Sequence, residues 1–297
     1  MSETIELPQQ GNPFLLSAQA GKNSVWRYLA TIILIVATVF FIGLVMVMIY
    51  FVMGGTLDVT KMPPTASFLI NMSIFPAGLA ALWAGITFLH RRRFISLITP
   101  RAAIAWRSLF LSALIWFVLS ALGDVVMAVF FTPGNYKFSF QLDNFLIFAL
   151  LSIILIPIQS STEELVFRGY LMQGFSLLAK RPWIPLVLSS AIFASLHSSN
   201  PEVASYGLGI MLLYYFSMGF LLGWITLQTA GLEAALGIHA ANNIYASLFV
   251  TFPSSALQTP ALFTMTAFNP VLSLIIFYIS AVIYLYLFRA LSQKTQP

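Results

Sequence analysis

The sequence contains no cysteine and few charged residues for its length of 297 residues. Without cysteine, the chain has no disulfide framework, no thiol nucleophile and no thiolate metal site. Charged residues make up 8% of the sequence, against roughly 25% in a typical soluble domain. Because so few charges cannot cover the surface of a folded chain in water, the composition excludes a soluble globular protein.

Hydrophobic residues, by contrast, make up 59% of the chain, and its mean hydropathy is +0.91. A chain with so much apolar surface is expected to lie in contact with lipid. The formal net charge of +5 is only a small surplus of basic residues, whereas nucleic-acid binding needs lysines and arginines clustered on a water-facing surface. We therefore expect a lipid bilayer as a partner, and no nucleic acid.

Runs of about 20 apolar residues, the length of a transmembrane helix, recur along the sequence. They predict an all-α fold, a polytopic membrane helix bundle of about eight transmembrane helices. The fifth and seventh runs are short and interrupted by polar groups, so we expect them in the interior of the bundle. The predicted spans cover approximately residues 27–53, 66–89, 105–131, 144–168, 184–199, 206–228, 232–250 and 270–290.

Basic residues alternate between the predicted loops as the positive-inside rule requires. Only Lys61 and Lys137 fall on the predicted outer side, and Arg168 lies within or at the end of a span. An even number of spans with both termini cytoplasmic fits this distribution. The predicted cytoplasmic side carries eleven basic residues: Lys22, Arg27, Arg91, Arg92, Arg93, Arg101, Arg107, Lys180, Arg181, Arg289 and Lys294.

The organisation along the chain is simple. Residues 1–24 are polar and contain prolines, which is typical of a flexible cytosolic tail, and residues 25–292 are predicted to form a single membrane domain. We find no internal repeat of the kind that marks many secondary transporters. The sequence thus predicts one integral, multi-pass membrane unit.

Several ionisable residues lie inside the predicted spans. Each charge at mid-membrane costs about 2.5–3.5 kcal/mol on insertion scales, so these residues are functional candidates by default. Two asparagines add amide groups next to one of the histidines. The set comprises Asp124, Glu163, Glu164, Arg168, His197 and His239, together with Asn242 and Asn243.

The two adjacent acids are expected to differ in role. Glu164 and Arg168 are four residues apart, so on a helix they share a face and favour an ion pair. Glu163 points about 100° away from that pair and is left for another task. A purely structural interpretation also stands, in which all three residues form an ion-pair network at a membrane boundary.

The histidines also occur in helical pairs. Phe193 and His197 are four residues apart, as are His239 and Asn243, so each pair projects from one helix face. Taken singly, His197 can be a hydrogen-bonded interfacial residue, and the alanines after His239 can simply permit tight helix packing. Taken together, the three groups of polar residues on successive helices are predicted to line one water-containing cavity.

These three strings resemble the motifs of the CPBP family, which comprises the CAAX prenyl proteases of the Ras-converting type and their prokaryotic relatives, the Abi family, associated with bacteriocin processing or immunity. Glu163-Glu164-x-x-x-Arg168 is similar to the family motif EExxxR. Phe193-x-x-x-His197 is similar to FxxxH, and His239-x-x-x-Asn243 to HxxxN. The resemblance covers a catalytic core at about residues 144–250.

The resemblance implies an intramembrane endopeptidase of a prokaryotic cell membrane that needs no metal or other cofactor. Glu163 and His197 would activate a water molecule, while His239 and Asn243 would bind the oxyanion. Arg168 would fix Glu164, whose role, structural or catalytic, stays open. The implied partner is a peptide or membrane-protein substrate, prenylated if the family name applies. These roles suit the chemistry, because a positioned acid or imidazole transfers protons and N–H groups stabilise a tetrahedral oxyanion.

Three alternatives remain at this stage. Glu163, His197 and His239 offer the two-histidine, one-acid ligand set of a catalytic zinc, although the HExxH motif of the zincins is absent. The polar spans can instead form the vestibule of a transporter, or of a non-proteolytic immunity or scaffold protein that binds a peptide without cutting it. Asp124 has no acidic partner in the sequence pattern and is left unassigned.

Overall fold

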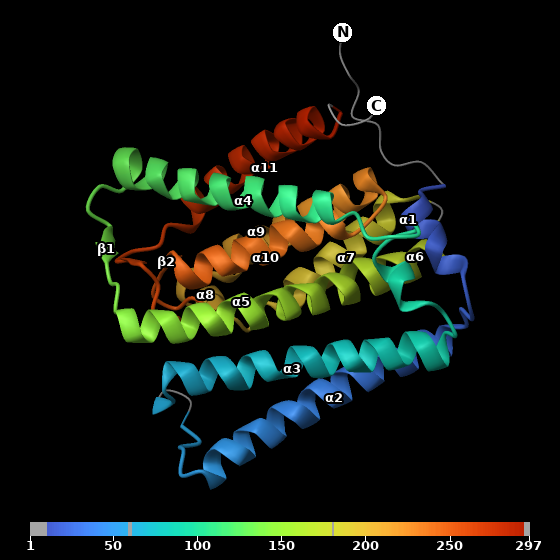
Figure 1. Ribbon diagram of the computed structural model, residues 1–297, viewed down its shortest axis with the longest axis horizontal. Helices are drawn as coiled ribbons and strands as arrows, with labels where there is room; N and C mark the ends of the chain where they lie inside the picture. The colour runs from blue at the N-terminus through green and yellow to red at the C-terminus, as the bar shows by residue number, and fades with distance from the viewer. Residues whose placement is uncertain (1–10, 59–60, 180, 294–297) are drawn as a thin grey trace.

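The computed structural model describes residues 11–58, 61–179 and 181–293. Most of the described chain is helical, and a small sheet lies at one end (Figure 1). The α-helices are α1 (Pro13–Leu16), α2 (Val25–Val52), α3 (Pro64–Ala84), α4 (Trp106–Val126), α5 (Leu142–Glu164), α6 (Gln173–Ser176), α7 (Trp183–Leu196), α8 (Pro201–Tyr206), α9 (Leu208–Thr229), α10 (Glu233–Leu248) and α11 (Pro270–Gln293).

Short helices of other types extend or join these elements. The π-helices η3 (Gly85–Leu89), η5 (Met127–Phe131) and η6 (Leu165–Met172) continue α3, α4 and α5, and the 3₁₀-helices are η1 (Ser17–Gln19) and η4 (Phe94–Leu97). The strands are β1 (Tyr136–Phe138), β2 (Val250–Thr251) and β3 (Phe263–Met265). The central strand β3 pairs antiparallel with β1 and parallel with β2.

Six helical stretches in the described residues are long and apolar enough to cross a membrane. They are Val25–Val52, Pro64–Leu89, Trp106–Phe131, Leu142–Ser176, Leu208–Thr229 and Pro270–Leu291. The two remaining predicted spans are also helical, but α7 has 14 residues and α10 has 16, fewer than the roughly 20 that a bilayer needs. The prediction of an all-α polytopic membrane bundle is confirmed, with these two short helices among its elements.

The short helix α10 occupies the interior, as predicted. It packs against α4, α5 and α9, and α7 packs against α9. Small residues on α10 permit this, since Gly237 lies so close to α4 that an added Cβ would be 2.1 Å from the carbonyl oxygen of Leu109. At the other extreme, the most apolar window of α2 has no buried residue and the helix packs mainly on α3 at the edge of the bundle (Figure 1).

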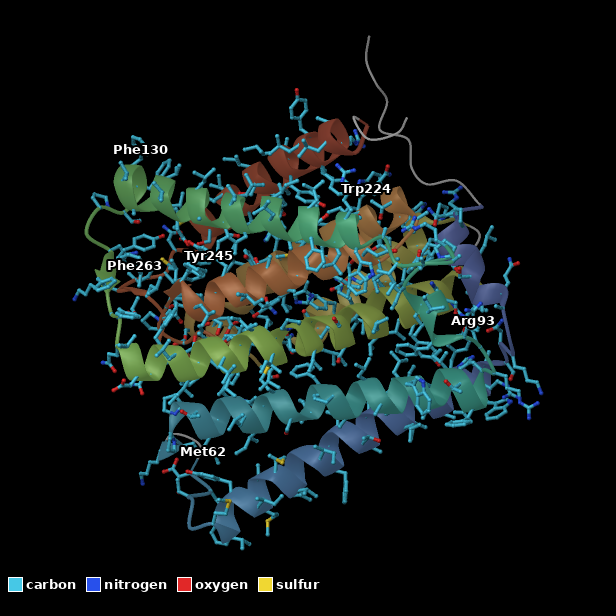
Figure 2. All side chains as sticks on the ribbon, viewed as in Figure 1. Met62, Arg93, Phe130, Trp224, Tyr245 and Phe263 are labelled. Carbon is cyan, nitrogen blue, oxygen red and sulfur yellow. The ribbon has the colours of Figure 1, made fainter. Side chains whose placement is uncertain are left out.

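The two ends of the bundle differ in charge. At one end, Lys22 N–H donates to the carbonyl oxygen of His90 at 2.7 Å, and Arg101 Nη1 donates to that of Thr229 at 3.1 Å. Helix α2 begins and α11 ends at this side, which carries Arg93, whereas Met62, Phe130 and Phe263 lie toward the opposite end (Figures 1 and 2). Lys180 and Lys294, also predicted on the basic side, lie outside the described residues.

The N-terminal segment differs from the flexible tail expected over residues 1–24. Residues 1–10 lie outside the described residues, but Pro13–Leu16 form a helix against the bundle. Phe14 is 0% exposed and joins the main hydrophobic core. The side chain of Asn12 accepts a hydrogen bond from Phe14 N–H at 3.0 Å and donates to the carbonyl oxygen of Leu227 at 2.7 Å. The buried side chains of Phe14 and Leu15, with the capping Asn12, therefore dock a segment that is polar on average.

Candidate active site

Glu163 and Glu164 lie at a change of helix type. They end α5, and the π-helix η6 begins at the next residue, within a continuous helical stretch over Leu142–Ser176. The predicted span here was 144–168, so the helix runs on beyond it to Ser176. π-helices are rare and occur frequently at functional sites. The change to a π-helix directly after the two acids therefore indicates a functional site at this position.

Glu164 and Arg168 form the ion pair that their spacing predicts. Arg168 Nη1 lies 2.6 Å from Glu164 Oε1, and both side chains are 0% exposed. Arg168 Nη2 donates to the carbonyl oxygen of Gly219 on α9 at 3.0 Å, and the ring of Phe193 lies 4.6 Å from the guanidinium carbon. A Cβ at position 219 would lie 3.2 Å from Nη2. Helix η6 is thus fastened to α9 through a buried charge.

One imidazole lies between the two acids. His239 Nδ1 lies 2.7 Å from Glu164 Oε1, and its Nε2 lies 3.6 Å from Glu163 Oε2. The shorter distance is a hydrogen bond in which Nδ1–H donates to the carboxylate, while the longer one exceeds direct hydrogen-bond range. Glu164 therefore holds both Arg168 and His239, and turns Nε2 of His239 toward Glu163.

Accessibility separates the two carboxylates. Each has one buried oxygen, Oε2, without a hydrogen-bond partner among the described residues. The side chain of Glu164 is 0% exposed, whereas that of Glu163 is 14% exposed. Glu163 is consequently the more accessible of the two acids.

Asn243 lies one helical turn after His239 and faces α5. Its Nδ2 donates to Gln159 Oε1 at 3.0 Å, and its Oδ1 accepts from Asn242 Nδ2 at 3.1 Å. Trp116 of α4 in turn donates to Asn242 Oδ1 at 3.1 Å. Gln159 was not among the predicted site residues, although its position four residues before Glu163 places it on the same helix face.

His197 occupies a different place from the one expected. It follows the last residue of α7, and its Nδ1 lies 2.7 Å from the carbonyl oxygen of Phe193. Its ring lies 4.3 Å from that of Phe193 and 4.4 Å from that of Tyr215. No contact in the described part of the chain joins His197 to Glu163. The imidazole beside Glu163 is that of His239, and the ring of Phe193, 6.2 Å from His239, contacts both histidines.

Asp124 belongs to another part of the fold. Its Oδ1 accepts a hydrogen bond from the hydroxyl of Tyr136 at 2.7 Å, which ties strand β1 to the end of α4. Of the eight polar residues singled out in the predicted spans, it is the one for which the structure shows such a link to the sheet. We assign it a structural role.

The ligand set proposed for zinc does not come together. Glu163 and His239 are neighbours, but His197 is held against Phe193 and Tyr215. Among the described residues, no group of three or more histidine, cysteine, aspartate and glutamate side chains is arranged to hold a metal ion. The residues present therefore do not fit the expected two-histidine, one-acid zinc site.

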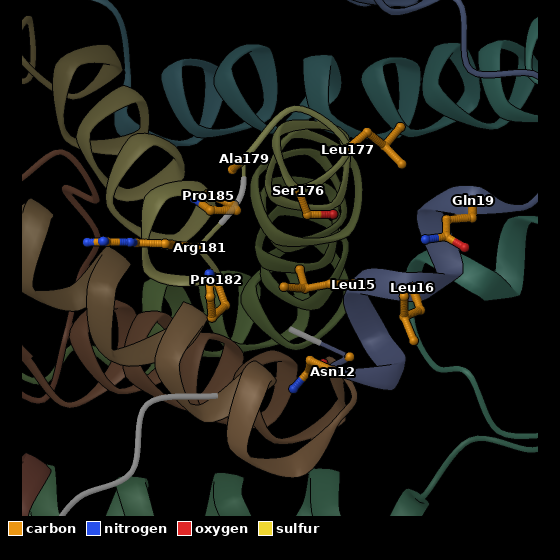
Figure 3. A pocket seen from close by; sticks show the side chains of 11 residues that line it. Asn12, Leu15, Leu16, Gln19, Ser176, Leu177, Ala179, Arg181, Pro182 and Pro185 are labelled. Atoms are coloured by element: carbon orange, nitrogen blue, oxygen red, sulfur yellow. The ribbon is translucent and has the colours of Figure 1, made fainter. Parts of the chain in front are cut away.

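A pocket of about 340 Å³ opens elsewhere, at the basic end of the bundle (Figure 3). It lies between α1, the end of α6 and the start of α7, and is lined by Asn12, Leu15, Ser176, Arg181 and Pro185 among others. None of the candidate site residues lines it. The candidate site is defined by its buried polar contacts and not by this pocket.

Comparisons with known proteins find one family model and one relative that match this chain. Residues 142–245 match the family described as type II CAAX prenyl endopeptidase Rce1-like. The uncharacterized protein YyaK of Bacillus subtilis (strain 168) is 30% identical over 272 residues, which cover 84% of this chain and 86% of that protein. No solved structure matches the chain. The matched family region runs from the start of α5 into α10, and so contains both helices that supply Glu163 and His239.

Proposed function

Because this chain belongs to the Rce1-like family of type II CAAX prenyl endopeptidases, we propose that it is an intramembrane peptidase in which Glu163 activates the attacking water. The observation that carries this proposal is the contrast between the two acids. Glu164 is closed off by Arg168 and His239, whereas Glu163 keeps a buried oxygen without a partner 3.6 Å from an imidazole.

In this proposal Glu163 acts as the general base. A carboxylate accepts a proton from a water molecule as that water attacks the scissile carbonyl, and can then return the proton to the leaving amine. In this hydrolysis the C–N bond of the peptide breaks and a C–O bond to the water oxygen forms. One proton of the water ends on the new amine and the other on the new acid. The side chain of Glu163 is 14% exposed, and the imidazole of His239 on α10 lies beside it.

Asn243 and His239 are the proposed donors to the oxyanion. Asn243 can turn an amide N–H to the developing charge by exchanging its contact with Gln159. His239 already donates its Nδ1–H to Glu164, so it can donate from Nε2 only as the imidazolium. Each such donor is worth about 2.7–4 kcal/mol of transition-state stabilisation.

His197 is assigned a secondary part in this proposal. Its Nδ1–H donates to the carbonyl oxygen of Phe193, which leaves Nε2 as the proton-accepting nitrogen. The ring of Phe193 packs against both His197 and His239. His197 would therefore contact the reacting atoms only through a bound substrate or a water molecule. We propose that its Nε2 relays the proton from Glu163 to the leaving amine.

The proposed substrate is a peptide or membrane protein, and the family name directs the first test to a prenylated C-terminal CAAX sequence. Purified protein would be incubated with farnesylated and unmodified CAAX peptides and a library of apolar peptides, and the products read by intact mass. We expect Glu163→Gln to lower turnover by at least about 10²-fold, the lower range for a general base, while the protein stays folded.

The matched control is Asp143→Asn, which makes the same chemical change at an exposed position on the same helix. It should cleave at the wild-type rate. A parallel arm adds a metal chelator. Activity in Glu163→Gln equal to that of the control would refute the role of Glu163, and chelator-sensitive activity restored by zinc would replace the glutamate mechanism while keeping the peptidase assignment.

A further inference from the structure

Three polar residues near His197 have no part in the function proposed above. Asn200 directly precedes the short helix α8, Glu202 lies within α8, and Tyr215 lies on α9. The hydroxyl of Tyr215 donates to Glu202 Oε1 and accepts from Asn200 Nδ2 at 2.8 Å. The segment of Asn200 and Glu202 is therefore joined to α9 through the hydroxyl of Tyr215.

The ring of this tyrosine supports His197. The two rings have centroids 4.4 Å apart and planes inclined by 30°, which is a stacked arrangement. The edge of the imidazole is held as well, because Nδ1 lies 2.7 Å from the carbonyl oxygen of Phe193. A histidine side chain has two rotatable bonds, and contacts on its face and on its edge restrict both of them.

Glu202 is costly to bury for the contact it makes. It is 5% exposed, and its Oε2 is buried without a hydrogen-bond partner among the described residues. The other oxygen, Oε1, accepts the hydrogen bond from Tyr215. A buried carboxylate that is not fully satisfied destabilises a fold, so packing alone does not account for an acid at this position. Its described contact is the anchoring of the tyrosine.

We propose that Tyr215, anchored by Glu202 and Asn200, is a positioning residue for His197. It holds the imidazole in one orientation and one tautomer, with Nδ1–H on the Phe193 carbonyl oxygen and Nε2 unprotonated. The effect on catalysis rests on the proposed function, in which His197 exchanges a proton, but the effect on the histidine itself does not.

The test compares four variants of the full-length protein. Tyr215→Leu removes the stacked ring, Tyr215→Phe keeps the ring and removes the anchor, and Glu202→Leu removes the acceptor. Glu202→Gln keeps an acceptor oxygen and serves as the conservative rescue. The matched control is Phe216→Leu, since Phe216 lies on the same helix and its ring packs on that of Phe220 at 6.1 Å.

Two readouts are needed. The first is peptide cleavage, with kcat and KM determined separately. The second is the ¹⁵N chemical shifts of the His197 ring, which report the tautomer without any substrate. The sequence has three histidines, so substituting each in turn assigns the signals.

We expect Tyr215→Leu and Glu202→Leu to lower kcat by about 10- to 100-fold, as a misplaced catalytic group does, with KM changed less than about twofold. Their His197 shifts should move toward the average of the two tautomers. Tyr215→Phe should fall between these variants and the wild type, and Glu202→Gln and Phe216→Leu should match the wild type in both readouts.

Unchanged His197 shifts in all folded variants would overturn the inference. This holds even if kcat falls in these variants, because a fall in kcat that accompanies a fall in thermal stability would then reflect a weakened fold. If Tyr215→Leu does not fold, Tyr215→Phe and Glu202→Leu decide. If the wild type cleaves none of the peptides, the proposed function fails but the shifts still decide whether Tyr215 positions His197.

Discussion

His239 contacts two carboxylates that do different things. Its Nδ1 meets Glu164 at 2.7 Å and its Nε2 approaches Glu163 at 3.6 Å. Glu164 also binds Arg168 at 2.6 Å, so this acid is the hub that orients both the guanidinium and the imidazole. The residue that binds no substrate in our proposal is thus the one with the most charged contacts.

Arg168 is expected to carry much of the local stability. Removing one partner of a buried ion pair typically costs about 3–5 kcal/mol, because the other charge stays buried. Arg168→Ala should therefore lower the thermal unfolding temperature and expression as well as activity, whereas Arg181→Ala, at an exposed arginine, should change neither. If Arg168→Ala is as stable as the wild type while Glu163→Gln unfolds, the structural and catalytic roles have been exchanged.

Residue spacing on one helix was predictable, and contacts between helices were not. The four-residue interval between Glu164 and Arg168 predicted their ion pair, which the structure forms. The expected pairing of Glu163 with His197 depended on how α5 and α7 pack, and the ring of Phe193 sets that arrangement. Gln159 and Tyr215 were not predicted because neither is charged at neutral pH and neither lies beside a histidine in the sequence.

The register of α10 against α4 decides where His239 and Asn243 lie. Gly237 precedes His239 by two residues, and an added Cβ there would lie 2.1 Å from the carbonyl oxygen of Leu109 and 3.1 Å from the backbone nitrogen of Ala113. Both obstacles are backbone atoms of α4, which cannot rotate away as a side chain does. A larger residue must therefore move one helix relative to the other.

Gly237→Ala should for this reason be destabilising, even though alanine favours helix formation more than glycine does. Overpacking typically costs about 1–3 kcal/mol, and the displacement of α10 should reduce peptide cleavage too. Gly209→Ala is the matched control, because a Cβ at that position in α9 meets nothing within 4 Å. It should be neutral or slightly stabilising. Equal thermal unfolding temperatures for the two variants would contradict the close contact of α4 and α10.

The helices of this fold were largely predictable from the apolar runs, and the small elements were not. Each of the predicted spans contains a helix, including the short α7 and α10. The strands β1, β2 and β3 have three, two and three residues, too few for a periodic pattern to appear. Docking of α1 also escaped prediction, since it depends on Phe14 finding the core and not on local hydropathy.

On the scale of the whole molecule, charge distinguishes one end from the other. The loop with Arg91, Arg92 and Arg93 lies at the end where α2 begins and α11 ends (Figures 1 and 2). Burial lowers the pKa of Arg92 to about 10, which leaves it positively charged at neutral pH. All three arginines therefore count toward the positive-inside rule, which predicts that this end faces the cytoplasm.

The absence of cysteine makes this orientation directly testable, because any introduced cysteine is the single thiol of the protein. Arg93 and Arg181 are exposed at the basic end, and Gln258 is exposed in the segment between β2 and β3 at the opposite end. In intact cells a membrane-impermeant maleimide should label Gln258→Cys, and it should label Arg93→Cys and Arg181→Cys only after permeabilisation. Labelling of all three from the same side would contradict the eight-span topology, in which five predicted spans separate position 93 from position 258 and place them in different compartments.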